Sequence, residues 1–268
     1  KAKKLGNKTL RYPTLFLRPS MTPQKISSAK LFILGFRSVI FFSFQVISLF
    51  IFAPLVLLSF PFSYQIRYRI ASRWAKLVIK ALKVICKLDF EVSGAEHIKG
   101  NGIIFCKHQS AWETFALQAI FPEQCWVLKR ELLWIPLFGW ALALTQPIAI
   151  DRSQKSRAFK QIVKQGIERL KTGRWVVIFP EGTRTAPGEK RKYMAGGAML
   201  AKKSGYPVIP VAHNAGEYWR KNAFIKYPGT IQVRIGEMIN SQDLSTRELN
   251  EQTEQWIEEQ MRIISPST

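Results

Sequence analysis

A histidine and a glutamate five residues apart are the two side chains of this sequence best suited to chemistry. They belong to the segment KHQSAWE, residues 107–113, which directly follows the strand-like run at residues 102–106. His108 could act as a general base, and Glu113 is placed to hold its second ring nitrogen and to stabilise the imidazolium. The spacing of Ser110 and Glu113 is also that of a capping box, so Glu113 could instead cap the helix that follows.

The dipeptide Asp151-Arg152 stands at the end of a second strand-like run, residues 147–150. A guanidinium at a strand end suits a phosphate, because its planar fork matches two phosphate oxygens, and Asp151 could orient it. Taken alone, the dipeptide is better explained by a surface ion pair.

The sequence PEGTR, residues 180–184, follows a third run at residues 175–179. Gly182 would let backbone N–H groups approach an anion closely, and Thr183 and Arg184 would add hydrogen-bond donors. The alternative is an ordinary turn. A fourth run, residues 208–211, carries no reactive group and could form the floor of a pocket.

Other kinds of catalytic site find little support in the sequence. The three histidines lack the spacing of metal ligands, and there is no P-loop or G-x-G-x-x-G motif. No G-x-S-x-G elbow surrounds Ser110, so a covalent serine nucleophile is not expected. The three cysteines are not spaced as C-x-x-C and do not suggest a disulfide scaffold. We therefore expect neither a metal nor a cofactor.

The elements that must position these residues alternate between strand and helix. The strand-like runs are residues 102–106, 125–128, 147–150, 175–179, 208–211 and 231–235, and the helical segments are residues 112–120, 156–171, 197–203 and 245–264. This alternation predicts an α/β fold with a mixed, largely parallel sheet flanked by helices. In such folds chemistry gathers where strands end and loops begin.

The first third of the chain carries most of the positive charge. The 268 residues include 40 Lys and Arg against 18 Asp and Glu, a formal net charge of +22, and the hydrophobic fraction of 47% is enough for a folded core. Residues 1–88 contain 16 basic residues and no acidic residue. This asymmetry indicates an anionic partner, and the lack of any nucleic-acid-binding motif favours membrane lipids over nucleic acid.

Residues 38–64 contain no charged side chain and predict association with a membrane. The segment is long enough to cross about 30 Å of hydrocarbon as a helix. However, Pro54 or Pro61 could break that helix into a hairpin that enters and leaves one leaflet. Spanning and one-leaflet insertion are both compatible with the sequence.

Residues 64–87 are expected to form a basic amphipathic helix at the lipid headgroups. Basic residues recur there at spacings of three and four: Arg69, Arg73, Lys76, Lys80, Lys83 and Lys87. Each could contribute about 1 kcal/mol toward binding an anionic leaflet. The alternative is a solvated face on a helix that packs on the catalytic domain.

These patterns divide the chain into three parts. Residues 1–30 form a basic tail, residues 31–88 the membrane-associated hydrophobic segment and amphipathic helix, and residues 89–268 the α/β domain. Residues 1–20 contain no Met and Met21 could serve as a start, so we expect part of the tail to be foreign to the native protein.

At its four polar or aliphatic strand ends the sequence resembles the glycerophospholipid acyltransferases, specifically the 1-acyl-glycerol-3-phosphate O-acyltransferases (lysophosphatidic acid acyltransferases). The family's His-x4-Asp/Glu block is matched at residues 108–113, its Arg-containing block at 150–152, its Pro-Glu-Gly-Thr-Arg block at 180–184 and its aliphatic-Pro-aliphatic block at 208–211. Residues 129–140, KRELLWIPLFGW, also look like the family, and the resemblance covers roughly residues 73–240. Two departures are Glu113, where Asp is commoner, and Lys107, where Asn is frequent.

The resemblance implies transfer of an acyl chain from a CoA or acyl carrier protein thioester to the 2-hydroxyl of lysophosphatidic acid, which makes phosphatidic acid without a cofactor. His108 would be the general base, supported by Glu113. The expected substrate-binding residues are Lys107, Arg152, Glu181, Gly182, Thr183 and Arg184.

The implied location is the inner (cytoplasmic) membrane, with the active site facing the cytoplasm and anionic lipids as partners. Two alternatives are an acyltransferase for a different lysolipid acceptor and a non-enzymatic basic protein of the membrane surface.

Overall fold

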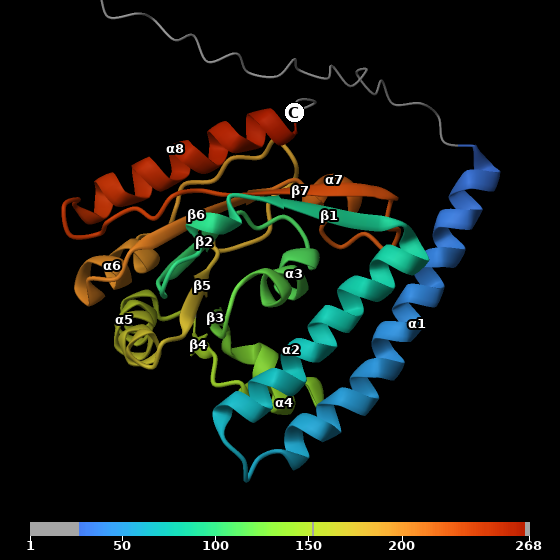
Figure 1. Cartoon of the computed structure of the whole chain (residues 1–268), viewed down its shortest axis with the longest axis horizontal. Helices are drawn as coiled ribbons and strands as arrows, with labels where there is room; N and C mark the ends of the chain where they lie inside the picture. Colours follow the sequence, from blue (N-terminus) through green and yellow to red (C-terminus); the bar gives the residue numbers. More distant parts are fainter. Residues whose placement is uncertain (1–26, 152, 266–268) are drawn as a thin grey trace, which may run out of the picture.

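The computed structural model describes residues 27–151 and 153–265, with a seven-stranded sheet at its centre (Figure 1). The strand order is β1-β7-β6-β2-β5-β3-β4, and all neighbouring strands are parallel except β6 and β7. The strands are β1 (Leu88–Ser93), β2 (Ile103–Cys106), β3 (Gln124–Lys129), β4 (Ile148–Ile150), β5 (Trp175–Ile178), β6 (Val208–His213) and β7 (Gly229–Ile235). The predicted α/β class with a mixed, largely parallel sheet is confirmed.

Helices cover both faces of this sheet. They are α1 (Ser28–Leu58), α2 (Tyr64–Ala81), α3 (Trp112–Ile120), α4 (Phe138–Leu144), α5 (Lys155–Lys171), α6 (Ala195–Ser204), α7 (Ala215–Tyr218) and α8 (Thr246–Ile264). One apolar core joins the sheet to α2 and α3 through Val78 and Trp112, and a second joins it to α6 and α8 through Leu200 and Ile257. Every residue of β2 and β5 is buried, as expected between two layers of helices.

The pairing of the central strands brings three loops together. β2 lies between β5 and β6 and runs parallel to both, so the carboxyl ends of all three strands meet at one edge of the sheet. The loops that leave these ends begin at residues 107, 179 and 214. This is the edge at which open α/β sheets bind their ligands.

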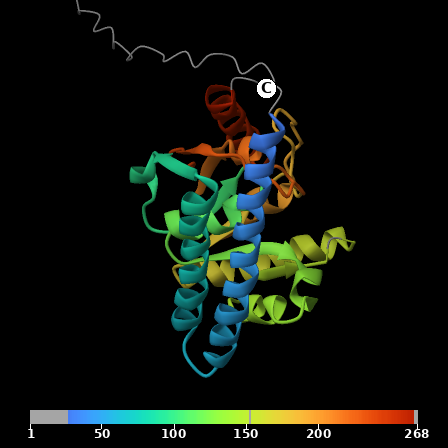
Figure 2. The same ribbon diagram turned by 90° about the vertical axis from the view of Figure 1, so that its right-hand side faces the viewer.

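A long helical hairpin of α1 and α2 packs along one side of the domain (Figures 1 and 2). α1 starts before the uncharged segment and includes Lys30 and Arg37. Pro54 lies within α1 and does not end it, and the chain turns only at residues 59–63, which include Pro61. A proline costs a helix one backbone hydrogen bond, which the packing of Ala53 and Val56 against α4 offsets.

The outward face of α1 is apolar and exposed. The helix is long and apolar enough to cross a membrane, yet only 22% of its most apolar 18-residue window is buried in the protein. Phe32, Phe50 and Leu58 are among the exposed side chains, at 75%, 64% and 75% exposure. A core helix would bury such residues, so this surface indicates membrane association.

The basic residues predicted to line one face of α2 all point to solvent. Arg69, Arg73, Lys76, Lys80, Lys83 and Lys87 are exposed. The opposite face of the helix packs on the domain, where Trp74 meets Phe115 of α3 edge-on with ring centroids 5.5 Å apart. α2 continues into a π-helical turn, Leu82–Cys86, that leads directly into β1.

Several short elements lie outside the sequence prediction. They are β1, the 3-10 turns Ala95–His97 and Arg130–Trp134, α4 and α7. Two of them, the Arg130–Trp134 turn and α4, form the connection between β3 and β4, and α4 packs against α1. This connection contributes to the site described next.

Candidate active site

His108 and Glu113 form a hydrogen-bonded pair at the carboxyl end of β2. His108 Nδ1 lies 2.7 Å from Glu113 Oε1. The Glu113 side chain is fully buried, whereas the His108 side chain keeps 15% of its surface exposed. Because Nδ1 is held by the carboxylate, Nε2 is the ring nitrogen left to face a substrate. This is the arrangement of a histidine base with an orienting carboxylate.

The same carboxylate also organises the loop that carries the histidine. Glu113 Oε1 accepts the backbone N–H groups of Gln109 and Ser110 at 3.0 and 2.9 Å. Glu113 therefore holds both His108 and the backbone just before α3, but the capping box considered for Ser110 and Glu113 does not form, because the N-cap of α3 is Ala111 and it has no side-chain cap. Burial alone would raise the pKa of Glu113, but the hydrogen bonds that the carboxylate accepts from His108 and from the Ser110 backbone outweigh it and hold the pKa below its usual range. The carboxylate is thus charged when His108 takes up a proton.

A second histidine, which the sequence analysis did not select, lies behind Glu113. His213 ends β6, and its Nε2 lies 3.9 Å from Glu113 Oε2 and 2.8 Å from the Lys107 carbonyl oxygen. Its Nδ1 accepts the backbone N–H of Ala215 at 3.2 Å. One donating and one accepting nitrogen define the neutral form of the ring. Burial lowers the pKa of His213, which agrees with this geometry.

The neutral state of His213 predicts a loss of stability in acid. Because the folded pKa lies below the unfolded value of about 6.5, the unfolded chain binds this proton first as the pH falls. The stability that neutral His213 contributes is complete above the unfolded pKa of about 6.5. It is lost as the pH falls below that pKa, with a slope of up to about 1.4 kcal/mol per pH unit. Urea unfolding in detergent from pH 7.5 to 5.0 should therefore show a shallower decline for His213→Gln. Parallel declines in the two proteins would contradict the assignment.

The loop after β5 holds His108 from its other side. The imidazole stacks on the Phe179 ring, with centroids 3.8 Å apart and planes 12° apart. The His108 backbone N–H donates to Glu181 Oε2 at 2.8 Å, and Thr185 N–H donates to the His108 carbonyl oxygen at the same distance. The first and third blocks of the sequence thus form one unit, in which the third fixes the backbone and ring of the base.

A buried ion cluster supports this unit. Lys107 Nζ lies 2.7 Å from Glu181 Oε1 and 2.7 Å from Glu258 Oε1, and the lysine side chain is 3% exposed. Burial alone would lower the pKa of Lys107, but the two carboxylates outweigh it and raise the pKa, so the ammonium is charged. Lys107 and Glu181 were expected to contact substrate. In the structure they face one another beneath the histidine loop, with Glu258 of α8 as a third member absent from the sequence prediction.

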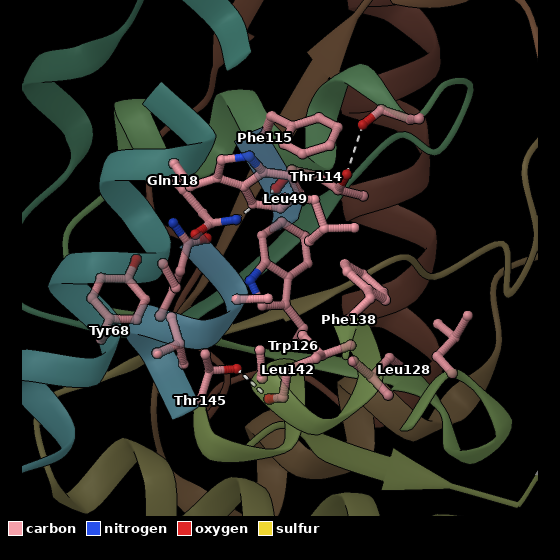
Figure 3. A pocket seen from close by; sticks show the side chains of 18 of the residues that line it. Leu49, Tyr68, Thr114, Phe115, Gln118, Trp126, Leu128, Phe138, Leu142 and Thr145 are labelled. Carbon is pink, nitrogen blue, oxygen red and sulfur yellow. Dashed lines mark hydrogen bonds between the residues drawn. The ribbon is translucent and has the colours of Figure 1, made fainter. Parts of the chain in front are cut away.

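An apolar cavity of about 450 Å³ begins at His108 and runs between the α1–α2 hairpin and the domain (Figure 3). Its walls are mostly aliphatic and aromatic, with Leu49 from α1, Tyr68 from α2, Phe115 from α3, Trp126 from β3 and Phe138 and Leu142 from α4. Two cations, Arg184 and Lys129, also line it. The shape and polarity suit a long acyl chain with a charged group at one end.

The other residues predicted to bind substrate do not all lie in the cavity. Arg184 lines the cavity with His108, while Gly182 makes the turn before it at φ 71°, where a Cβ would come 2.5 Å from the Met194 sulfur. Thr183 is partly exposed between them. Arg152 lies outside the described residues. Asp151, its neighbour, accepts a hydrogen bond from Arg130 at 3.0 Å. Within the described ranges, no group of three or more His, Cys, Asp or Glu is placed to hold a metal ion.

Comparison with known proteins agrees with this geometry. A family model described as Acyltransferase matches residues 89–214, which contain both loops around His108. The chain is 47% identical over 236 residues to a 1-acyl-sn-glycerol-3-phosphate acyltransferase of Pseudomonas aeruginosa, covering 86% of this chain and 92% of that protein. A protein of the same name from Cocos nucifera is 27% identical over 202 residues, covering 75% of this chain and 65% of its own.

A crystal structure of the 1-acyl-sn-glycerophosphate acyltransferase PlsC from Thermotoga maritima has the same fold. It superposes with a TM-score of 0.72 at 22% identity, over 85% of this chain and 94% of that one. The fold is that of an acyltransferase, and the region that carries the site matches the acyltransferase family model. The chain belongs to the 1-acyl-sn-glycerol-3-phosphate acyltransferase family, as the relative from Pseudomonas aeruginosa shows.

Proposed function

We propose that this enzyme transfers an acyl chain from a thioester to the 2-hydroxyl of 1-acyl-glycerol 3-phosphate and so makes phosphatidic acid. The observation that carries the proposal is that His108, held by Glu113, and Arg184 both line one apolar cavity. A base, an acyl-chain site and a phosphate-binding cation are the three parts that this reaction needs. The names of the relatives support the same acceptor.

The proton path follows from the orientation of the imidazole. His108 Nε2 removes the proton of the acceptor hydroxyl as its oxygen attacks the thioester carbonyl carbon. Glu113 stabilises the imidazolium that forms. The tetrahedral intermediate then collapses, the carbon–sulfur bond breaks, and the imidazolium returns the proton to the leaving thiolate. The products are an ester and a free thiol, and His108 is again neutral.

The surroundings of the base favour direct transfer over an acyl-enzyme. Ser110 is fully buried, and its hydroxyl oxygen accepts the Trp112 backbone N–H at 3.2 Å. Cys106 is also buried, and burial raises the pKa of its thiol well above the usual value. Neither side chain is available as an activated nucleophile.

The acceptor's phosphate is assigned to Arg184, with Arg152 as its expected partner. Binding the phosphate there would fix the 2-hydroxyl beside His108 and contribute orientation to the rate. The donor is an acyl thioester of CoA or acyl carrier protein. Because such donors are cytoplasmic, we place the active site at the cytoplasmic face of the inner membrane, with the apolar face of α1 in lipid.

The phosphate assignment predicts a loss of acceptor binding in Arg184→Ala. Losing a charge-assisted bidentate contact of about 1.5–3 kcal/mol should raise KM for 1-acyl-glycerol 3-phosphate by about 10- to 100-fold, with a smaller change in kcat. Steady-state kinetics with this acceptor and with phosphate-free 1-acyl-glycerol measure the effect. Arg191→Ala, which removes an exposed arginine of the same connection, is the control.

For the wild type the phosphorylated acceptor should be strongly preferred, and Arg184→Ala should reduce that preference. Equal turnover of the two acceptors by the wild-type enzyme would favour a different lysolipid acceptor. An unchanged KM in Arg184→Ala would remove Arg184 from the phosphate site.

A further inference from the structure

The connection between β3 and β4 exposes a cluster of large apolar side chains. This connection consists of the 3-10 turn Arg130–Trp134, a bend at residues 135–137 and α4. Trp134 is 65% exposed, Trp140 55% and Ile135 44%. Two exposed tryptophans within seven residues are unusual on a surface that faces only water.

This connection lies directly against α1. Ala141 of α4 packs with Ala53 and Val56 of α1 in a small apolar cluster, which Leu137 also joins. Figure 2 shows the connection, in lime green, beside the lower half of α1. The exposed Trp140 thus belongs to a helix that borders the apolar helix α1.

The inner side of the same connection forms part of the cavity wall. Leu132, Phe138 and Leu142 line the cavity, while Trp134 and Trp140 point to the outside. A single short segment thus separates the acyl-chain cavity from the molecular surface beside α1. Lipid at that surface would lie next to the cavity.

The charges of the segment fit the polar part of a bilayer. Lys129 and Arg130 are exposed at its start, and the Arg130 guanidinium lies 6.0 Å from the centre of the Trp134 ring. Each cation has a carboxylate partner, Glu131 for Lys129 and Asp151 for Arg130. Tryptophans next to basic side chains are typical of the headgroup level, where the ring lies in the interface and the charge meets lipid phosphates.

We propose that residues 130–140 form a second membrane-contacting surface, with Trp134, Ile135 and Trp140 inserted in the interfacial region of the bilayer. Continuity with the apolar face of α1 identifies the occupant as lipid. Together with α1, this surface fixes the tilt of the domain and holds the cavity wall against the leaflet. The contact does not depend on which acceptor the enzyme uses.

Spin labels on the full-length protein in anionic phospholipid vesicles test this contact. Trp134→Cys and Trp140→Cys would each carry a nitroxide, whose accessibility to oxygen and to a water-soluble nickel chelate reports its depth. The native cysteines Cys86, Cys106 and Cys125 are buried and should label poorly, and the unsubstituted protein measures that background. Phe50→Cys on α1 serves as the lipid reference. Lys203→Cys, on α6 at the opposite side of the domain, serves as the water reference (Figure 1).

In the vesicles, we expect the ratio of oxygen to nickel accessibility at positions 134 and 140 to lie close to that of Phe50→Cys and well above that of Lys203→Cys. A ratio equal to that of Lys203→Cys, with Phe50→Cys in lipid, would overturn the proposal. Protection from both reagents together with dipolar broadening between labels would also overturn it, since it would show a second copy of the chain on this surface.

Discussion

The His108→Ala variant is expected to lose about 10²- to 10⁴-fold in kcat, which is the usual contribution of a general base. His108 lines the apolar cavity, and the buried Glu113 carboxylate holds its Nδ1 at 2.7 Å. Because the side chain is partly exposed and its loop is held through backbone atoms, the variant should fold. Initial rates with saturating acceptor and donor measure the loss.

The histidine at position 97 offers a matched control. His97 Nδ1 lies 3.0 Å from the carbonyl oxygen of Ile235, and His97 is not among the residues that line the cavity. His97→Ala should retain the wild-type kcat. If His108→Ala turned over at the same rate as His97→Ala, the base would have to be sought elsewhere.

The second large effect is expected for Glu113→Gln, with a decrease in kcat of about 10²- to 10⁴-fold. The buried carboxylate accepts hydrogen bonds from His108, Gln109 and Ser110 and lies close to His213. Whichever way a glutamine amide is turned, its NH2 group meets at least one of these donors. The imidazolium would also lose its counter-charge. The dependence of kcat on pH should separate this electrostatic loss of activity from a loss of activity caused by unfolding.

The shorter carboxylate distinguishes charge from packing. Glu113→Asp keeps the charge one methylene further from His108 and should recover a large part of the activity lost in Glu113→Gln. Glu168→Gln, an exposed position on α5, should behave as the wild type. Equal loss in the Asp and Gln variants, with thermal midpoints matching the wild type, would show that the Glu113 charge does not support the base.

The sequence alone predicts the scaffold and the contact between His108 and Glu113, whose catalytic role stays a prediction. The apolar runs before His108 and before Pro180 are strands β2 and β5, and their parallel pairing explains why two blocks 73 residues apart meet at one base. Periodicity also locates α3, α5, α6 and α8, because each has one long apolar face. These features depend on local pattern, which a sequence displays directly.

The supporting contacts could not be predicted because they join distant parts of the chain. Glu258 meets Lys107 across 151 residues, and nothing in the surface-helix pattern of α8 distinguishes that glutamate from its neighbours. His213 lies just past the fourth strand-like run, so its position at a strand end was the signal available. Lys107 points beneath the histidine loop because its ammonium pairs there with the carboxylates of Glu181 and Glu258. The local sequence does not reveal these partners.

The apolar N-terminal segment has a role beyond what its composition indicates. Hydrophobicity suggests that α1 associates with a membrane, but does not show that its inner side, with Leu49 and Val56, forms a wall of the cavity at His108. Pro54 is tolerated within α1 because tertiary packing overrides a local penalty. The membrane-associated hairpin and the catalytic domain therefore share one site.

The most direct test of this account is product analysis with purified, detergent-solubilised enzyme. The protein would be incubated with 1-acyl-glycerol 3-phosphate and either an acyl-CoA or an acyl–acyl carrier protein, and the lipids analysed by mass spectrometry beside a parallel His108→Ala reaction. We predict phosphatidic acid bearing the donor's acyl chain from the wild type, with at least one donor, and almost none from His108→Ala. No phosphatidic acid from a folded wild-type protein with either donor, or equal amounts from both proteins, would contradict the account.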